Sequence, residues 1–490
     1  MTETIREKLS QMRQIVKTDP EGAASFVCEK DRILSCLSHE DPKVRKNAAL
    51  LLGMLPWDED KPQILMALYD AYENEETLYV RPSYIKGMRT LGEPLSAEMR
   101  LHLKERVKKL SVTKMDEEEK KHLTEERRML LSLLQNAGFL HSFNGISERV
   151  PLLLTSEEEY IPYLMKELEQ RGVPHSDIRR TPFGIRVMSE ELSSILSARL
   201  YDKIYFIVPI KRGDKLTEDS LRETLIHSML SDLLSRYLSG EDPIPFRVNV
   251  RLKDGSPEKT GALQKKIAGI LEEIYNGRLY NAPGNYEIEL LFGQREDQSF
   301  GLFLWFAAYK DMRFSYRKES AATSMSGHKA AAMIEMLYPY LKEGGLCLDP
   351  LCGTGMLLIE RGMVKPPAKT FGTEVYASSV AAAKENAAEA DAAIHFIQKD
   401  YFDFTYDGTF DEIITEFPDL FHKEKEEKIL FLRRFFETST RLTAKGAIWG
   451  ILTGEENLFK QQIRLTKGLT LVETIPFGGR RTLYICRRGR

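Results

Sequence analysis

Cysteine is scarce in this chain of 490 residues, and its arrangement excludes two classes of protein. The five cysteines form no pair with the spacing of a zinc or iron–sulfur site, so no metal site is expected. Their scatter and odd number argue against a disulfide framework and favour a reducing compartment, so the protein is expected in the cytoplasm. These residues are Cys28, Cys36, Cys347, Cys352 and Cys486.

Long apolar runs and a strong net charge are also lacking. No apolar stretch reaches about 18 residues, so no transmembrane helix is expected, and Met1 to Lys8 does not have the composition of a signal peptide. The net charge of −3 does not indicate nucleic-acid binding, so any RNA contact must come from local basic patches. The chain has 42% hydrophobic and 29% charged residues, which is ordinary for a soluble protein of about two to four domains.

The strongest functional signal lies in the stretch from Asp349 to Gly355. Leu346 to Leu348 is short and apolar like a buried strand, and Met356 to Glu360 reads as the first turn of a helix. Pro350 and the glycines that follow prevent the strand from continuing. A strand, a glycine turn and a helix in this order present a ligand at the carboxyl edge of a doubly wound α/β sheet.

Three kinds of ligand are bound by such turns. A P-loop would need a lysine directly after Gly355, and none is present. The dinucleotide fingerprint needs a third glycine, and Leu358 occupies that position. The remaining ligand is S-adenosylmethionine, whose ammonium end is expected to bind Asp349 directly or through water. The alternative is a glycine turn that only connects a strand to a helix.

Two further predicted strands end in acidic residues. Glu374 ends the strand that begins at Thr370 and stands 19 residues after Gly355, close to the roughly 20 expected for an acid that holds ribose hydroxyls. Asp400 ends the next strand, and with Tyr401 it is expected to face the adenine. For each acid singly, the alternative is a solvated loop carboxylate. The predicted cofactor-binding residues are Asp349, Pro350, Cys352, Gly353, Gly355, Glu374, Asp400 and Tyr401.

These residues resemble those of a known family, the THUMP-domain RNA N2-guanine methyltransferases. The 349–355 turn matches the cofactor loop of that family, and Tyr316-Arg317-Lys318 with the helix predicted over 327–337 is similar to its entry into the catalytic domain. The similarity is firm over about 310 to 420 and fainter over about 146 to 310. It implies a methyltransferase that uses S-adenosylmethionine and forms N2-methylguanosine in tRNA or rRNA.

The chain departs from this family after the fourth predicted strand, at 410–415. The family has Asn or Asp, two prolines and an aromatic residue there, where this chain has Glu416, Phe417, Pro418 and Asp419. In such a site a polar side chain and a proline carbonyl hold the target amine, and the aromatic ring stacks on the base. The resemblance makes Glu416, Phe417 and Pro418 the catalytic candidates, with Phe421 as a replacement ring. Two hypotheses follow: an active enzyme with a rearranged substrate pocket, or a relative that binds S-adenosylmethionine, with or without RNA, and transfers no methyl groups.

The N-terminal region, residues 1–145, is predicted to be all-α. A proline turn and helix near Val44-Arg45 has an echo near Val80-Arg81, a period of 36 residues that resembles HEAT-type repeats. The alternative is an ordinary helical bundle. Lys104 to Arg128 is predicted to be one long charged helix. A protein partner that docks on this region is a third hypothesis for the function.

The middle region, residues 146–310, is predicted to be α+β. Strands at 150–155, 184–188 and 203–208 with helices between them suggest a ferredoxin-like unit. The strand at 245–253, the helix at 262–275 and the strands at 286–292 and 299–308 carry the THUMP-like resemblance, which implies that the module holds the 3′ end of tRNA. The phosphate contacts would be Arg247, Arg251, Lys253, Lys265 and Lys266. The alternative is that these basic side chains are only solvated.

The C-terminal region, residues 311–490, is predicted to be a Rossmann-like α/β methyltransferase domain. A fifth strand is expected at 447–453, followed by a closing pair at 469–475 and 481–486. The arginines near the C-terminus form a basic edge, which is either an RNA contact or solubilising charge. The predicted fold class is therefore multidomain, with HEAT-like, ferredoxin-like plus THUMP-like, and Rossmann-like regions in that order.

Overall fold

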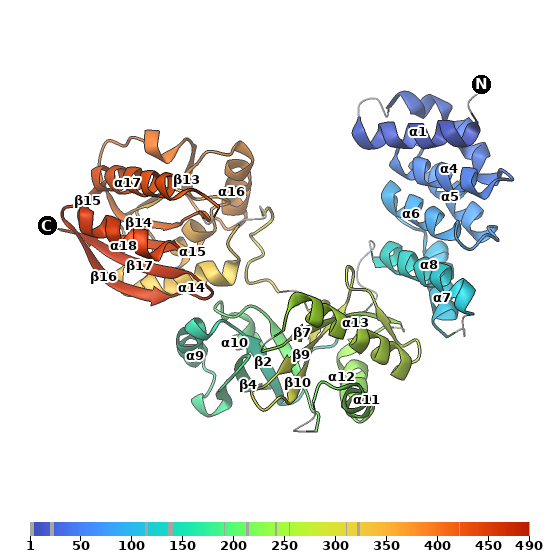
Figure 1. Ribbon diagram of the computed structural model, residues 1–490, viewed down its shortest axis with the longest axis horizontal. Helices are drawn as coiled ribbons and strands as arrows, with labels where there is room; N and C mark the ends of the chain where they lie inside the picture. Colours follow the sequence, from blue (N-terminus) through green and yellow to red (C-terminus); the bar gives the residue numbers. More distant parts are fainter. Residues whose placement is uncertain are drawn as a thin grey trace. The chain divides into compact units, whose positions relative to one another are not determined.

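The computed structural model describes residues 4–19, 24–112, 116–135, 141–190, 192–211, 215–240, 243–253, 255–309, 311–320, 324–420 and 422–489. The chain divides into two compact units, and each unit is built from two separate segments. Figure 1 shows the helices and strands of these segments, coloured along the sequence. Unit 1 contains residues 1–145 and 207–309, and unit 2 contains residues 146–206 and 310–490. The boundaries predicted at 145/146 and 310/311 follow the chain linearly and stay a prediction.

The first segment of unit 1 is helical, as predicted. Its helices are α1 (Ile5–Thr18), α3 (Lys30–Ser35), α4 (Pro42–Met54), α5 (Lys61–Glu73), α6 (Arg81–Leu91), α7 (Ala97–Val112) and α8 (Glu117–Gln135). Short 3-10 turns lie at Ala24–Glu29 and Cys36–Ser38. The single helix predicted over 104–128 is wrong, because that run is divided between α7 and α8. The charged composition gave no sign of the break.

Small residues and buried ion pairs fix how these helices pack. A Cβ atom on Gly53 would lie 2.4 Å from the carbonyl oxygen of Gly87, so only glycine allows α4 and α6 to approach this closely. Arg45, near the start of α4, binds the buried Glu75 at 2.7 Å. Arg81, at the start of α6, binds the buried Glu126 at 3.0 Å. Both arginines of the sequence echo thus bind a buried glutamate, although Glu75 lies between α5 and α6 and Glu126 lies inside α8, and the HEAT-like repeat itself stays a prediction.

The second segment of unit 1 contains a mixed sheet with helices. Its strands run in the order β10 (Phe300–Phe306), β9 (Ile288–Gln294), β7 (Ile244–Arg251) and β8 (Leu279–Asn281). β10 and β9 are antiparallel, whereas β7 is parallel to both of its neighbours. The helices are α11 (Glu218–Ile226), α12 (Leu230–Tyr237) and α13 (Pro257–Ile274), and β6 (Leu238–Ser239) pairs with β1 (Ser142–Phe143).

The first segment of unit 2 has the order β2 (Val150–Thr155), α9 (Ile161–Gln170), β3 (Ile178–Thr181), β4 (Gly184–Ser189), α10 (Ser193–Leu196) and β5 (Ile204–Val208). The strands are antiparallel neighbours in the order β3-β4-β2-β5. This β-α-β-β-α-β sequence of elements is the one expected of a ferredoxin-type unit. The strand β3 was missing from the sequence prediction.

The second segment of unit 2 is a doubly wound sheet with the order β13-β12-β11-β14-β15-β17-β16. Its strands are β11 (Leu346–Asp349), β12 (Lys369–Glu374), β13 (Ile394–Gln398), β14 (Phe410–Glu416), β15 (Thr443–Thr453), β16 (Leu469–Pro476) and β17 (Thr482–Arg488). The first five are parallel and β17 is antiparallel to both neighbours. The Rossmann-like prediction and its closing pair are confirmed, and the fifth strand begins earlier than predicted.

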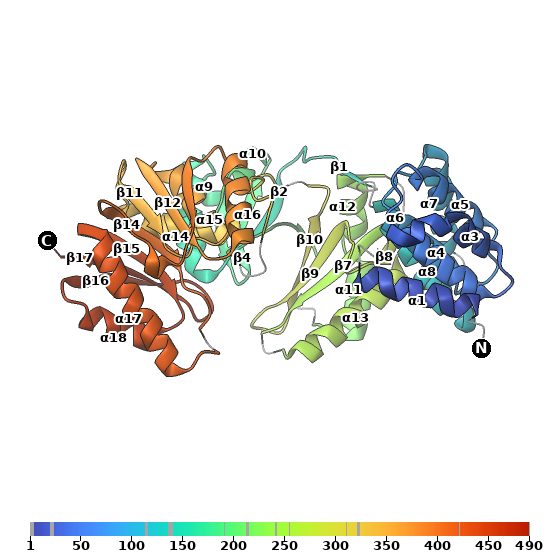
Figure 2. The ribbon, with the colours of Figure 1, turned by 90° about the horizontal axis from the view of Figure 1, so that it is seen from above.

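Helices cover both faces of this sheet (Figure 2). They are α14 (Gly327–Leu337), α15 (Met356–Val364), α16 (Ala377–Glu389), α17 (Lys425–Leu442) and α18 (Glu456–Leu465). α15 contacts α14 and α16, and α17 packs beside α18. Because the parallel strands all run in one direction, the carboxyl ends of β11, β12, β13, β14 and β15 meet at one edge.

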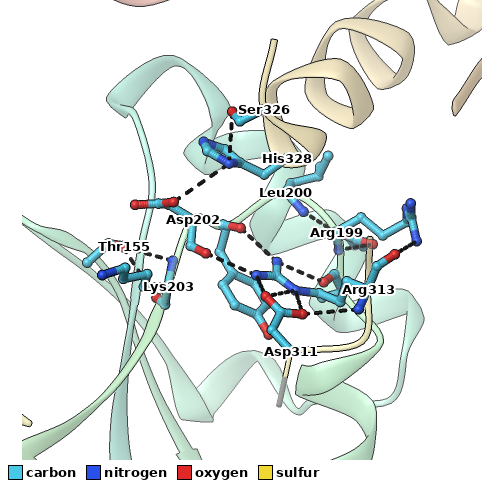
Figure 3. Close-up of polar contacts among 12 residues, drawn as sticks. Thr155, Arg199, Leu200, Asp202, Lys203, Asp311, Arg313, Ser326 and His328 are labelled. Atoms are coloured by element: carbon cyan, nitrogen blue, oxygen red, sulfur yellow. Dashed lines mark hydrogen bonds and ion pairs between the residues drawn. The ribbon is translucent and has the colours of Figure 1, made fainter. Parts of the chain in front are cut away.

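Arg313 joins the two segments of unit 2 (Figure 3). Its side chain is buried and donates to the carbonyl oxygens of Tyr201 at 2.7 Å and Asp202 at 3.0 Å. Asp311 accepts from the Arg313 Nε atom at 2.9 Å and neutralises its charge. The Arg313 carbonyl accepts from Arg199 at 2.9 Å, so an arginine of each segment donates to a backbone carbonyl of the other segment.

Arg199 also binds α15, the helix that follows the glycine turn. Its guanidinium binds both carboxylate oxygens of Glu360, at 2.6 and 3.1 Å. Glu360 lies in α15, is almost fully buried, and also accepts from the Tyr316 hydroxyl. The ferredoxin-type segment is therefore fixed to the helix that starts at residue 356.

Among the described residues, no helix is both long enough and apolar enough to cross a membrane.

Candidate active site

The glycine turn lies where β11 ends, and its two glycines have different roles. Gly353 has φ +50° and Gly355 has φ +82°, a region that favours glycine. A Cβ atom on Gly353 would meet no protein atom within 4 Å, so this face of the turn is open to a ligand. A Cβ atom on Gly355 would lie 2.9 Å from the Phe396 ring, so packing requires that glycine. Gly353 is therefore the residue of the turn that has room for a ligand.

Asp349 ends β11 and is almost fully buried. Its Oδ1 atom accepts from the Thr415 hydroxyl at 2.7 Å and from the Leu351 backbone N–H at 3.0 Å. Burial raises the pKa of this carboxyl from 3.8 to about 7, and the two hydrogen bonds only partly oppose the shift. In the protein alone, the Asp349 carboxyl is therefore only partly ionised near pH 7. A cationic ligand group beside it would favour the ionised carboxylate.

Glu374 ends β12 and ties that strand to the turn. Its Oε2 atom accepts from the Gly353 backbone N–H at 3.1 Å, and its Oε1 atom accepts from the N–H groups of Val375 and Tyr376 at 2.9 and 3.0 Å. The acid predicted to hold ribose thus lies beside the open face of the turn. Its backbone contacts fix its orientation.

The structure separates the pair predicted to face the adenine. Asp400 is exposed and its carboxylate caps a short turn by accepting from the Phe402 N–H at 2.9 Å. The Tyr401 ring lies in the hydrophobic core against Phe435, and its hydroxyl bonds Ser439 at 2.8 Å. The expectation that the Tyr401 ring faces the adenine is wrong, because the turn at 401–403 directs that side chain inward.

The four residues after β14 also divide. Glu416 is partly exposed at the end of β14 and forms an ion pair with Arg481 from the loop between β16 and β17. Phe417 is buried, with its ring 4.6 Å from that of Phe435, so its prediction as a stacking ring for the base is wrong. Pro418 and Asp419 are exposed at the surface. Phe421, the predicted replacement ring, lies outside the described residues.

The basic residues predicted to bind phosphates lie in unit 1, and three of the five form ion pairs with carboxylates, among them the exposed Lys253 with Glu296 at 3.6 Å. Arg247 binds the buried Glu289 at 2.9 Å and lies over the Tyr286 ring at 4.1 Å, so its role as a free phosphate contact is wrong. Lys266 pairs with Glu218 at 2.5 Å. The side chains of Arg251, Lys253 and Lys265 are exposed.

One residue that contacts the turn was missed. Asn386 in α16 is fully buried, and its amide donates to the carbonyl oxygens of Thr354 at 3.1 Å and Glu319 at 3.0 Å. Its own oxygen accepts from the Glu319 N–H at 3.1 Å. A signal was present in the sequence: Asn386 lies at helical spacing with Val380 and Ala383 on the apolar face of an alanine-rich helix. A polar residue in that position needs buried partners.

Comparisons with known proteins find similarity to one family model and to solved structures. Residues 328–475 match a family model described as the methyltransferase small domain. The crystal structure of TrmN from Thermus thermophilus is 18% identical, covers 69% of this chain and 99% of its own chain, and has a TM-score of 0.51. A structure described as a predicted N6-adenine-specific DNA methylase from Listeria monocytogenes is 18% identical, covers 70% and 97%, and has a TM-score of 0.49. No curated protein sequence matches the chain.

At these identities the likeness to the solved structures is one of fold. The chain thus combines a helical N-terminal region, a mixed-sheet middle and a Rossmann-like C-terminal domain whose residues 328–475 match the methyltransferase small domain. The THUMP-like and HEAT-like assignments stay predictions.

Proposed function

We propose that this protein is an S-adenosylmethionine-dependent RNA methyltransferase that forms N2-methylguanosine in tRNA or rRNA. The observation that supports it most directly is the open Gly353 face, whose turn is bonded to the carboxylates of Asp349 and Glu374. The match of residues 328–475 to the methyltransferase small domain supports the reaction class. RNA and the guanine amine come from the family resemblance of the sequence.

The residues of the turn fit S-adenosylmethionine. Its methionine end would lie along the backbone at Gly353, where no side chain fills the space, with its ammonium group toward Asp349. Glu374 would accept hydrogen bonds from the ribose hydroxyls beside Gly353. When bound, S-adenosylmethionine supplies an electrophilic methyl group. The Tyr401 ring is excluded from this set, because it lies in the core.

On the substrate side, the chain must orient a poor nucleophile. The lone pair of the guanine amine is delocalised into the ring, and a hydrogen-bond acceptor on that amine turns the nitrogen toward the methyl donor. Glu416 ends β14 at the same edge of the sheet where Glu374 ends β12, and β11 lies between these two strands. The Glu416 carboxylate is a suitable acceptor. The exposed Pro418 offers a backbone carbonyl as a second acceptor.

A second function is favoured by one observation. Phe417 is buried in the core and Asp419 stands where the family has its aromatic residue, so no described residue of the 416–420 segment supplies an exposed ring for stacking. This supports the alternative of a relative that binds cofactor and RNA without transferring methyl groups. The protein-docking role of the helical N-terminal region stays a prediction.

Calorimetry with S-adenosylmethionine tests the cofactor half of the proposal. We expect micromolar-range binding by the wild type and its loss in Gly353→Val, because the branched side chain occupies the open face of the turn. Gly446→Val is the matched control: Gly446 also has a positive φ, +87°, and open space, but it lies near the start of β15. No heat with the wild-type protein, or equal losses in both variants, would overturn the cofactor assignment.

A further inference from the structure

A cleft of about 620 Å³ lies in unit 2 between residues 423–428 and residues 454–461. One wall is the approach to α17 and its first turn, and the other is the end of β15 with the start of α18. The two helices lie side by side (Figures 1 and 2). None of the predicted site residues lines this cleft.

Strand register places the cleft at the edge of the sheet where β14 ends in Glu416, which we call the substrate edge. Glu416 is opposite Leu452 on β15, so the end of β14 is beside the residues that lead to Gly454. Thr453 pairs with Thr482, which also pairs with Pro476, so the 477–481 loop between β16 and β17 is at this same edge. A Cβ atom on Gly454 would lie 3.5 Å from the Arg480 carbonyl, so this loop borders the cleft directly.

The acidic side chains of the cleft are neutralised by neighbours. Glu455 binds Lys428 at 2.7 Å, and Glu456 binds Lys460 at 2.5 Å. Lys425 on one side and Arg480 on the other are exposed, and neither forms an ion pair with any other residue in the ranges described above. Among the residues that line or border the cleft, the charge without an ion pair is therefore positive, and the exposed Glu424 and Glu426 beside Lys425 in the chain are outside the lining.

The loop that carries Arg480 is held in place. The Phe477 N–H donates to the Arg481 carbonyl at 3.0 Å, which closes the loop over two glycines with positive φ. The Tyr160 hydroxyl donates to the Phe477 carbonyl at 2.9 Å, and the two rings are 5.0 Å apart. Arg481 turns toward Glu416, so Arg480 is the cation of this loop that is left for a ligand.

We propose that this cleft binds the phosphate backbone of the nucleic acid on either side of the target nucleotide, with Lys425 and Arg480 as phosphate contacts. The inference rests on the proposed function, because a base that reaches Glu416 carries its phosphates past this edge. The site is separate from the basic residues of unit 1, of which Arg247 and Lys266 already bind carboxylates. Lysine and arginine contacts of this kind give affinity without sequence preference.

The test compares two double variants of the full-length protein. Lys425→Gln with Arg480→Gln removes the two rim charges. Arg464→Gln with Lys467→Gln removes the same charge from two exposed residues, one in the last turn of α18 and one between α18 and β16. The probe is tRNA prepared from cells that lack the protein, and its affinity is measured by fluorescence anisotropy over a range of salt concentrations, with calorimetry of S-adenosylmethionine alongside.

We expect the cleft variant to bind tRNA about tenfold more weakly at low salt and to lower the salt slope by about 1.4, for two contacts on a single-stranded segment. The control variant should bind like the wild type. Equal affinities for all three proteins, or equal losses in both variants, would overturn the proposal. S-adenosylmethionine binding distinguishes failure of this proposal from failure of the proposed function. If the wild-type protein does not bind S-adenosylmethionine, the cofactor assignment is refuted, whatever affinity the cleft variant has for tRNA.

Discussion

At the scale of single residues, Asp349 links the fold to a measurable pH dependence. The sequence identifies this acid at the end of a strand, and the structure adds that it is almost fully buried, which raises its pKa to about 7. The unfolded chain would ionise the group near pH 3.8, so its contribution to stability is present at low pH and is lost as the pH rises toward 7. Binding of an ammonium group has the opposite sign, because it needs the ionised carboxylate.

We therefore predict that the affinity for S-adenosylmethionine rises as the pH increases from about 5.5 to about 7, by up to about tenfold per pH unit at the acid end. Above about pH 8 it should fall again, because the α-amino group of the ligand loses its proton. Calorimetry over this range checks the profile. Asp349→Asn should bind weakly and without the acid-side rise; a wild-type affinity that is flat below pH 7 would contradict the role of Asp349.

Glu416 supports a second prediction at this scale. Its carboxylate is at the substrate edge and touches no part of the glycine turn, so Glu416→Ala should leave S-adenosylmethionine affinity almost unchanged. Methyl transfer should fall by about 10²–10³-fold, the cost of removing one positioned polar group. The measurement is transfer from labelled S-adenosylmethionine into RNA from cells that lack the protein.

Two outcomes of this experiment are informative in different ways. Glu416→Asn restores the family residue and should retain activity. If the wild type binds the cofactor but transfers nothing, and Glu416→Asn with Asp419→Tyr gains transfer, the binding-only relative is the correct function. If Glu416→Ala transfers as well as the wild type, the target amine is held by another residue.

At the scale of elements, the sequence was most informative about strand ends. The parallel strands are predicted from short apolar runs that Asp349, Glu374 or Glu416 ends or follows, and a doubly wound sheet brings these ends to one edge. That pattern does not show whether a side chain that follows a strand end points toward the ligand or into the core. Tyr401 and Phe417 each follow a strand end, and their rings lie in the core, where both pack against Phe435 of α17.

Long-range partners explain the other failures at this scale. Arg247 reads as an exposed basic residue on an alternating strand, but the strand beside it carries the buried Glu289. That pairing joins positions 42 residues apart, and a local pattern cannot show it. The same holds for Asn386, whose position on the apolar face of α16 indicates buried partners but does not identify Thr354 or Glu319.

At the scale of the whole molecule, the chain forms two compact units that each use two segments, an arrangement that the linear domain prediction does not address. The sequence patterns place region boundaries near residues 145 and 310, but they do not show that each unit combines two separate segments. In unit 2 the return is fixed by Arg313, whose donors satisfy the carbonyls of Tyr201 and Asp202. The stability of that connection is therefore a property that one substitution can test.

We predict that Arg313→Met, which roughly keeps the side-chain volume and removes the donors, destabilises the junction within unit 2 by about 3 kcal/mol, since the carbonyls of Tyr201 and Ala198 lose a buried hydrogen bond. Arg179→Met is the control, because Arg179 is an exposed arginine on β3 of the same segment. Hydrogen exchange followed by mass spectrometry should show faster exchange in Arg313→Met for peptides from both 192–206 and 311–320. Faster exchange in 311–320 alone would mean that the ferredoxin-type segment keeps its place without Arg313, through Arg199 and Glu360. A change in both regions would show that the position of this segment against α15, and hence against the glycine turn, depends on Arg313.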